Sequence, residues 1–89
     1  MARIVFTPQL RRFVESPDFA TTRGDLRAAL EDAFAAHPRL RGYVLDEQGD
    51  LRANVVVFID GRRCLDRHRL DDALAPASQV HVLQALSGG

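Results

Sequence analysis

The stretch that decides the fold is residues 54–64, which read Asn54-Val55-Val56-Val57-Phe58-Ile59-Asp60-Gly61-Arg62-Arg63-Cys64. Its first half is β-branched and aromatic, a composition that favours extended backbone. Asp60-Gly61 follows directly and is typical of a two-residue type I′ turn, because glycine accepts the positive φ angle that this turn requires. The sequence therefore predicts a β-hairpin whose second strand returns through residues 62–64.

Two more strands are predicted near the start of the chain. Ile4-Val5-Phe6 has strand composition, and Pro8 follows closely, so a short first strand begins almost at the first residue. Residues 9–16 show no dominant period and are expected to form a loop or a short turn of helix. Residues 19–22 are expected to form a second, weakly signalled strand.

A last strand is predicted close to the other end of the chain. Residues 70–74 are expected to form a helical turn, and Pro76-Ala77-Ser78 has the composition of a tight turn. Residues 80–85 then alternate in a way that favours a strand.

One amphipathic helix is predicted between the two halves of the strand pattern. Thr22 and Asp25 are three residues apart and resemble a capping box, which places the start of the helix at Thr22. Pro38 is expected to end it. Between these limits apolar residues recur at helical spacing and define one buried stripe: Leu26, Ala29, Leu30, Ala33 and Phe34.

These elements predict an α+β roll with the order β-β-α-β-β-β. The mixed sheet has about five strands, and one main helix covers one of its faces. Residues 1–89 form a single domain, because a chain this short cannot close two cores. Such a domain has little room for an enclosed pocket, so a self-contained enzyme is not expected.

The charge balance argues against two classes of partner. Twelve basic groups stand against twelve acidic groups, which removes the broad field that binding to nucleic acids or anionic membranes usually requires. No apolar run reaches the length of a membrane span, and the N-terminus lacks the apolar core of a signal peptide. We therefore expect a cytoplasmic protein that binds neither nucleic acid nor membrane.

Candidate side chains for catalysis or metal binding are few. Cys64 is the only cysteine, so neither an internal disulfide nor a Cys-x-x-Cys pair can form. In the middle of a strand it is expected to be a small core residue and not a nucleophile. His37, His68 and His81 show no ligand spacing, so no metal site is expected.

The printed sequence ends with Leu86-Ser87-Gly88-Gly89, directly after the predicted last strand. Residues 86–89 are expected to form a flexible C-terminal tail that carries a free carboxylate at Gly89. A carboxylate must be activated before acyl transfer, and the activating enzyme has to enclose it. Glycine suits a narrow channel because it has no Cβ atom.

Three segments together resemble the MoaD/ThiS family of ubiquitin-like sulfur carriers: residues 42–47, 55–61 and 80–89. The resemblance covers most of the chain from Thr22 onward. Two departures are Gln84, where the family often has proline, and residues 76–79, which replace an Asp-Gly-Asp turn.

The resemblance implies a β-grasp fold and a function in sulfur transfer. An E1-like adenylyltransferase would use ATP to adenylate Gly89, next to Gly88. A sulfur donor, either a sulfurtransferase or a cysteine desulfurase, would convert the adenylate to a thiocarboxylate. The thiocarboxylate would then supply a biosynthetic enzyme that makes molybdopterin, thiamine or cysteine. The chain would be a carrier with no permanently bound cofactor, or the small subunit of a complex such as molybdopterin synthase.

A partner-binding surface is predicted from the strand pattern itself. Both faces of the strand at residues 54–59 are apolar, and one helix cannot cover both. If Val80 and Val82 point to the helix, the opposite face is left as a small apolar patch beside the tail. The predicted partner-binding residues are Val56, Phe58, His81, Leu83, Leu86 and Ser87.

Two alternative functions follow from the same sequence. A ubiquitin-like modifier would join Gly89 to lysines of other proteins, whereas a β-grasp interaction module would use no tail chemistry. All twelve basic residues are arginines. The chain therefore offers no side-chain amine for linkage to itself, which argues modestly against the modifier. The basic stretch at residues 62–69 is interpreted as a solvated face with local ion pairs.

Overall fold

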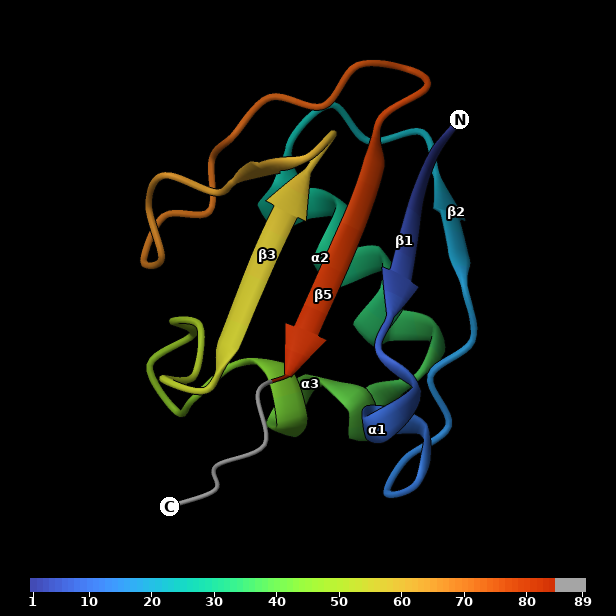
Figure 1. Cartoon of the computed structure of the whole chain (residues 1–89), viewed down its shortest axis with the longest axis vertical. Helices are drawn as coiled ribbons and strands as arrows, with labels where there is room; N and C mark the ends of the chain where they lie inside the picture. The colour runs from blue at the N-terminus through green and yellow to red at the C-terminus, as the bar shows by residue number, and fades with distance from the viewer. Residues whose placement is uncertain (85–89) are drawn as a thin grey trace.

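In the computed structural model, which describes residues 1–84, five strands form one mixed sheet in the order β2-β1-β5-β3-β4 (Figure 1). β1 and β5 are parallel, and the other neighbouring strands are antiparallel. The predicted mixed sheet of about five strands is confirmed. The strands are β1 (Ala2–Phe6), β2 (Phe19–Thr21), β3 (Val55–Ile59), β4 (Arg62–Arg63) and β5 (Gln79–Gln84).

Three helices pack against this sheet within residues 1–84; in Figure 1 one of them lies behind the sheet and the other two lie at its lower end. They are α1 (Pro8–Arg11), α2 (Leu26–Ala36) and α3 (Pro38–Val44). α2 is the predicted main helix, and its whole apolar stripe is buried as expected. Within residues 1–84, no helix is both long enough and apolar enough to cross a membrane.

The predicted start of the main helix at Thr22 is wrong. α2 begins at Leu26, and the N-cap is Asp25, whose Oδ2 accepts a hydrogen bond from the Ala28 amide at 3.2 Å. The amides of Leu26 and Arg27 donate to carbonyl oxygens of residues 72 and 70, at 3.0 and 2.8 Å. A segment distant in sequence therefore satisfies the first turn, which local capping patterns do not reveal.

The helix ends before Pro38 as predicted, but Pro38 also begins α3, which the sequence analysis missed. Proline is well suited to the first turn of a helix because the amide hydrogen it lacks has no partner there. Pro8 opens α1 in the same way. α1 is the short turn of helix that was one of two expectations for residues 9–16.

The hairpin prediction is confirmed. Asp60 and Gly61 have φ angles of 51° and 82°, as a type I′ turn requires. β4 is one residue shorter than predicted, although the Cys64 amide still donates to the Val57 carbonyl oxygen at 2.8 Å.

The predicted helical turn at residues 70–74 is wrong. Asp25 and Ala73 form an antiparallel bridge, and the Leu74 amide donates to the Gly24 carbonyl oxygen at 2.9 Å. Leu70 has a φ angle of 55°, in the left-handed region. Extended pairing with the start of α2 takes the place of local helical hydrogen bonds in this segment.

The side chain of Arg27 in α2 forms hydrogen bonds to the loop that precedes residues 70–74. Its guanidinium donates to the carbonyl oxygens of Gly49, His68 and Arg69, which belong to two separate loops. One side chain thereby joins three backbone oxygens that otherwise have no helix or strand partner. Hydrogen bonds from a charged donor are among the stronger ones in proteins.

Arg27→Met is expected to lower the free energy of unfolding by about 1–3 kcal/mol, because it removes a charged donor but keeps the apolar stem of the side chain. Urea unfolding measures the change, and hydrogen exchange should show faster opening of residues 66–72. The matched control is Arg23→Met, which removes an exposed guanidinium paired with Asp32. It should change stability little. Equal losses in the two variants would contradict the stabilising role of Arg27.

Candidate partner-binding site

The site is the face of the sheet that the helices leave open. Val55, Val57 and Ile59 point into the core, so the side chains between them point the other way. β5 follows the same alternation, with Val80 and Val82 in the core. The structure thus places on the open face all the predicted partner-binding residues that it describes: Val56, Phe58, His81 and Leu83.

The register of β3 and β5 brings these four residues into two adjacent pairs. Val56 lies opposite Leu83, and Phe58 lies opposite His81. Leu83 is 38% exposed and His81 is exposed, whereas Val56 and Phe58 are half-buried. The four side chains form one continuous patch, which we call the open-face patch.

Two residues that the sequence analysis did not assign to this site extend it. Val5 of β1 lies opposite His81, and Arg63 of β4 lies opposite Phe58. The alternation of Ile4, Val5 and Phe6 could have placed Val5 on the open face. Its position beside His81 depends on the parallel pairing of β1 with β5, which no local pattern reveals.

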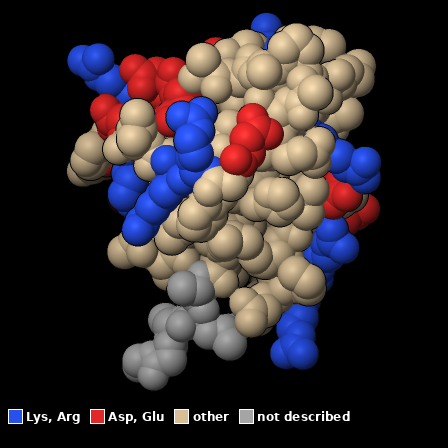
Figure 2. All heavy atoms as spheres, turned by 45° about the horizontal axis from the view of Figure 1, so that its top comes forward, with Lys and Arg blue, Asp and Glu red and all other residues tan. Residues whose placement is uncertain are grey.

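The open face is mainly uncharged, with charged side chains around it. Figure 2 shows a broad area without acidic or basic side chains, with arginine on its left, one acidic side chain at its upper edge, and basic and acidic side chains on its right. A mainly apolar centre with a charged rim is the usual composition of a protein-binding surface.

The remaining predicted site residues, Leu86, Ser87, Gly88 and Gly89, lie outside the described residues. The last described residue, Gln84, is paired with Val55 at the end of β5. In Figure 1 this end of the sheet lies beside α1 and α3. Leu83 and Val56 are therefore the open-face residues nearest to Gln84, after which residues 85–89 continue the chain.

Cys64 is a core residue, as predicted. Its side chain is buried, and burial raises the pKa of its thiol, with the nearby carboxylate of Asp72 acting in the same direction. A raised pKa keeps the sulfur protonated and weakly nucleophilic. Burial and the raised pKa both fit a core position.

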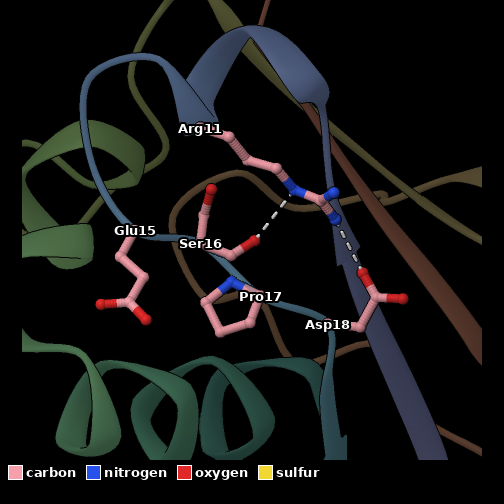
Figure 3. Close-up of a pocket in the computed structure, with 5 residues that line it drawn as sticks. All are labelled: Arg11, Glu15, Ser16, Pro17 and Asp18. Carbon is pink, nitrogen blue, oxygen red and sulfur yellow. Dashed lines mark hydrogen bonds and ion pairs between the residues drawn. The ribbon is translucent and has the colours of Figure 1, made fainter.

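A separate surface hollow of about 550 Å³ lies between α1 and β2 (Figure 3). Arg11 crosses it, donating through Nε to the Ser16 carbonyl oxygen at 3.3 Å and through its terminal nitrogen to Asp18 at 3.0 Å. Arg3 also pairs with Asp18, at 2.9 Å. Arg3, Arg11 and Asp18 therefore pair with one another at this hollow.

The basic stretch at residues 62–69 contains one ion pair between loops. His68 Nδ1 lies 2.8 Å from Asp50 Oδ2. The hydrogen bond to Asp50 raises the pKa of His68, and the charge of the same carboxylate adds to the effect. No group of three or more His, Cys, Asp or Glu side chains within residues 1–84 is arranged to hold a metal ion.

The His68–Asp50 pair predicts a weak dependence of stability on pH. Because the folded-state pKa of His68 is raised, the pair stabilises the fold fully below the ordinary histidine value of about 6.5. This contribution is lost as the pH rises through the folded-state pKa. The effect is expected to be small, since the side chain of His68 is 77% exposed.

An NMR titration tests this prediction. The titration midpoint of His68 should be higher in the wild-type protein than in Asp50→Asn, which keeps the shape of the side chain and removes its charge. Identical midpoints would show that the ion pair does not form in solution.

The fold defined by this sheet and these helices is that of the ubiquitin-like β-grasp proteins, and comparison with solved structures supports the assignment over the full chain. SAMP1 from Haloferax volcanii is 23% identical with a TM-score of 0.80, covering 99% of this chain and 98% of its own. A chain of the Amycolatopsis orientalis BexX/CysO complex is 13% identical with a TM-score of 0.81 and full coverage of both chains. CysO from Mycobacterium tuberculosis is 18% identical with a TM-score of 0.79, covering 97% of this chain and all of its own.

No protein-family model matches the sequence, and a search of curated proteins found no significant relative. At these low identities the similarity establishes the ubiquitin-like β-grasp fold, as the resemblance to MoaD/ThiS sulfur carriers implied.

Proposed function

We propose that this protein is a sulfur carrier whose Gly89 carboxylate is adenylated by an E1-like enzyme and then converted to a thiocarboxylate. The observation that carries the proposal is the position of Gly88 and Gly89, four and five residues beyond the end of β5, which is the middle strand of a ubiquitin-like sheet. A terminus that follows a central strand is anchored at its base by pairing on both sides. An enzyme can therefore bind the open face of the sheet while it adenylates the carboxylate of Gly89.

The chemistry requires an acyl group that fits inside another protein. Adenylation joins the carboxylate oxygen to the α-phosphate of ATP and releases pyrophosphate. The terminal sulfur of a persulfide on the sulfur donor then attacks the acyl carbon and AMP leaves, which gives an acyl disulfide. A second thiol of the donor reduces this disulfide, which releases the thiocarboxylate and leaves a disulfide on the donor. ATP belongs to the partner enzyme in this proposal, and the carrier itself binds no permanent cofactor.

The open-face patch is the proposed contact for the activating enzyme and for the biosynthetic enzyme that accepts the sulfur. Its exposed apolar side chain, Leu83, lies near the end of β5 that leads to Gly89, opposite the half-buried Val56. The BexX/CysO complex is one case in which a protein of similar fold assembles with another protein. We also propose a reducing compartment, the cytoplasm, because the single cysteine is a free thiol.

A second candidate function is modification of other proteins through Gly89. The observation in its favour is the name of a structural neighbour, small archaeal modifier protein 1. This chain contains arginine but no lysine, so a modifier of this sequence could not build side-chain-linked chains on itself.

The intact mass of the protein distinguishes these functions. It should be measured after coexpression with the E1-like enzyme and sulfur donor of the same organism. A carrier gains the mass difference between one sulfur and one oxygen atom, located at Gly89 by fragmentation. A modifier instead appears as Gly89 adducts on lysines of other proteins. An unchanged mass with no adducts, or a mature chain that does not terminate at Gly89, contradicts both functions.

A further inference from the structure

Two aromatic side chains are stacked on the surface: Phe13, which follows α1, and Tyr43 of α3. The ring centroids of Phe13 and Tyr43 are 6.5 Å apart, and the ring planes differ by 21°. Phe13 is 60% exposed, and Tyr43 is half-buried against the core. Among residues 1–84, Phe13 is the only aromatic side chain with most of its surface in water. Such exposure of a large apolar group is a common feature of binding surfaces.

Two arginines that are close to this stack in sequence form no ion pair within residues 1–84. Arg11 and Arg41 each form an ion pair with an acidic side chain of this chain. Arg12 and Arg39 are exposed and form none within residues 1–84. Arg39 precedes Tyr43 by four residues in α3, which places both on the same side of the helix. Arg12 directly precedes Phe13.

A hollow of about 250 Å³ lies between the segment that follows α1 and the junction of α2 with α3, and Val14 in its lining directly follows Phe13 in sequence. This volume is sufficient for one apolar side chain of a partner. Its only acidic lining residue is Glu15, and the full lining is Val14, Glu15, Ala36, His37, Pro38 and Arg39.

This surface lies at the same end of the molecule as the last residue of β5. In Figure 1, α1 and α3 lie at the end of the molecule where β5 stops at Gln84. The five residues from 85 to 89 span at most about 17 Å when fully extended. An enzyme that encloses Gly89 must therefore approach this end of the domain.

We infer that Phe13, Tyr43, Arg12 and Arg39 form a second docking surface for the enzyme that activates Gly89, separate from the open-face patch. Its occupant is an acidic segment of that enzyme that inserts an apolar side chain beside the aromatic stack. Aromatic residues and arginine are the residue types most enriched in protein interfaces, and unpaired guanidinium groups attract a complementary acidic segment. The inference rests on the proposed function.

ATP–pyrophosphate exchange measures activation directly. The assay uses the full chain as substrate of the purified E1-like enzyme from the same organism. Phe13→Ser and Arg39→Glu should each raise the KM for this protein by about tenfold, because truncating one interface anchor typically costs that much affinity. The kcat should be unchanged, since neither residue touches the reacting carboxylate. The Arg39→Glu defect should also shrink as salt is added.

Matched controls are Leu65→Ser and Arg69→Glu. Leu65 is 89% exposed, and both residues lie on the loop between β4 and β5, away from the aromatic stack. They remove the same kinds of exposed side chain and should leave the KM unchanged. Circular dichroism tests whether each variant is folded. If Phe13→Ser does not fold, Arg39→Glu still tests the inference.

Three results would overturn the inference. If the wild-type protein supports exchange and the Phe13 and Arg39 variants equal the controls, the second surface is wrong and the proposed function stands. If the wild-type protein supports no exchange, the proposed function fails as well. If anionic phosphatidylserine vesicles capture the wild-type protein but not Phe13→Ser, the surface binds membranes and not the enzyme.

Discussion

Deletion of Gly89 is expected to reduce thiocarboxylate formation to background while leaving the domain folded. The buried core among the described residues lies between Ala2 and Val82, so the deletion removes none of it. The carboxylate would move to Gly88, one residue closer to the sheet, and would stop about 3.5 Å short of the position that full-length protein reaches. Misplacement of a reacting group by even a fraction of this distance lowers reaction rates strongly.

The measurement combines intact mass after coexpression with ATP–pyrophosphate exchange in vitro. Gly89→Ala is the matched variant, because it restores the length of the chain and adds one Cβ atom. If enclosure in a narrow channel is required, Gly89→Ala is also impaired, though less than the deletion. Sulfur transfer by the deletion variant at the wild-type rate would refute a function of the terminal carboxylate.

Val82→Asp and Leu83→Asp are expected to have opposite consequences, although the residues are adjacent in β5. Val82 is 1% exposed in the core, whereas Leu83 is 38% exposed on the open-face patch. A buried carboxylate without a partner costs several kcal/mol, which is comparable to the total stability of a domain of this size. Val82→Asp should therefore unfold the protein at neutral pH, as circular dichroism and urea titration would show.

Leu83→Asp should fold and lose partner binding. The new carboxylate remains in water in the free protein, but it would be buried without a partner in any complex that covers the open-face patch. We expect the KM in the exchange assay to rise by at least about 30-fold, the effect of losing an interface hot spot. Leu83→Ser, which removes the apolar contact without adding charge, should have a smaller effect. A folded Leu83→Asp protein with wild-type kinetics would exclude the open face as the binding site.

Elements with strong local signals were predicted well. The Val55–Ile59 strand and the Asp60-Gly61 turn were found because side-chain alternation and positive φ angles depend on a few adjacent residues. The apolar stripe of α2 was found because helical spacing is equally local. From that alternation the open face followed, and with it Val56, Phe58, His81 and Leu83.

Elements whose hydrogen bonds come from distant parts of the chain were predicted poorly. Asp25, not Thr22, caps α2, because carbonyl oxygens of residues 70 and 72 take the first amides of the helix. Residues 70–74 are extended for the same reason. α3 was not predicted because Pro38 was interpreted only as the end of the preceding helix, although proline is equally suited to begin the next one.

The sequence by itself determined the buried stripe of α2 and which faces of the central strands are apolar, since both follow from the period of hydrophobic residues along each element. It also showed that the chain contains no lysine. Only the tertiary structure decided that β1 lies parallel to β5 and adds Val5 to the open face. It alone brought Phe13 and Tyr43 together from segments 30 residues apart in sequence. Contacts of this kind depend on how the elements pack, and the free energy of packing is shared among many residues that no local pattern connects.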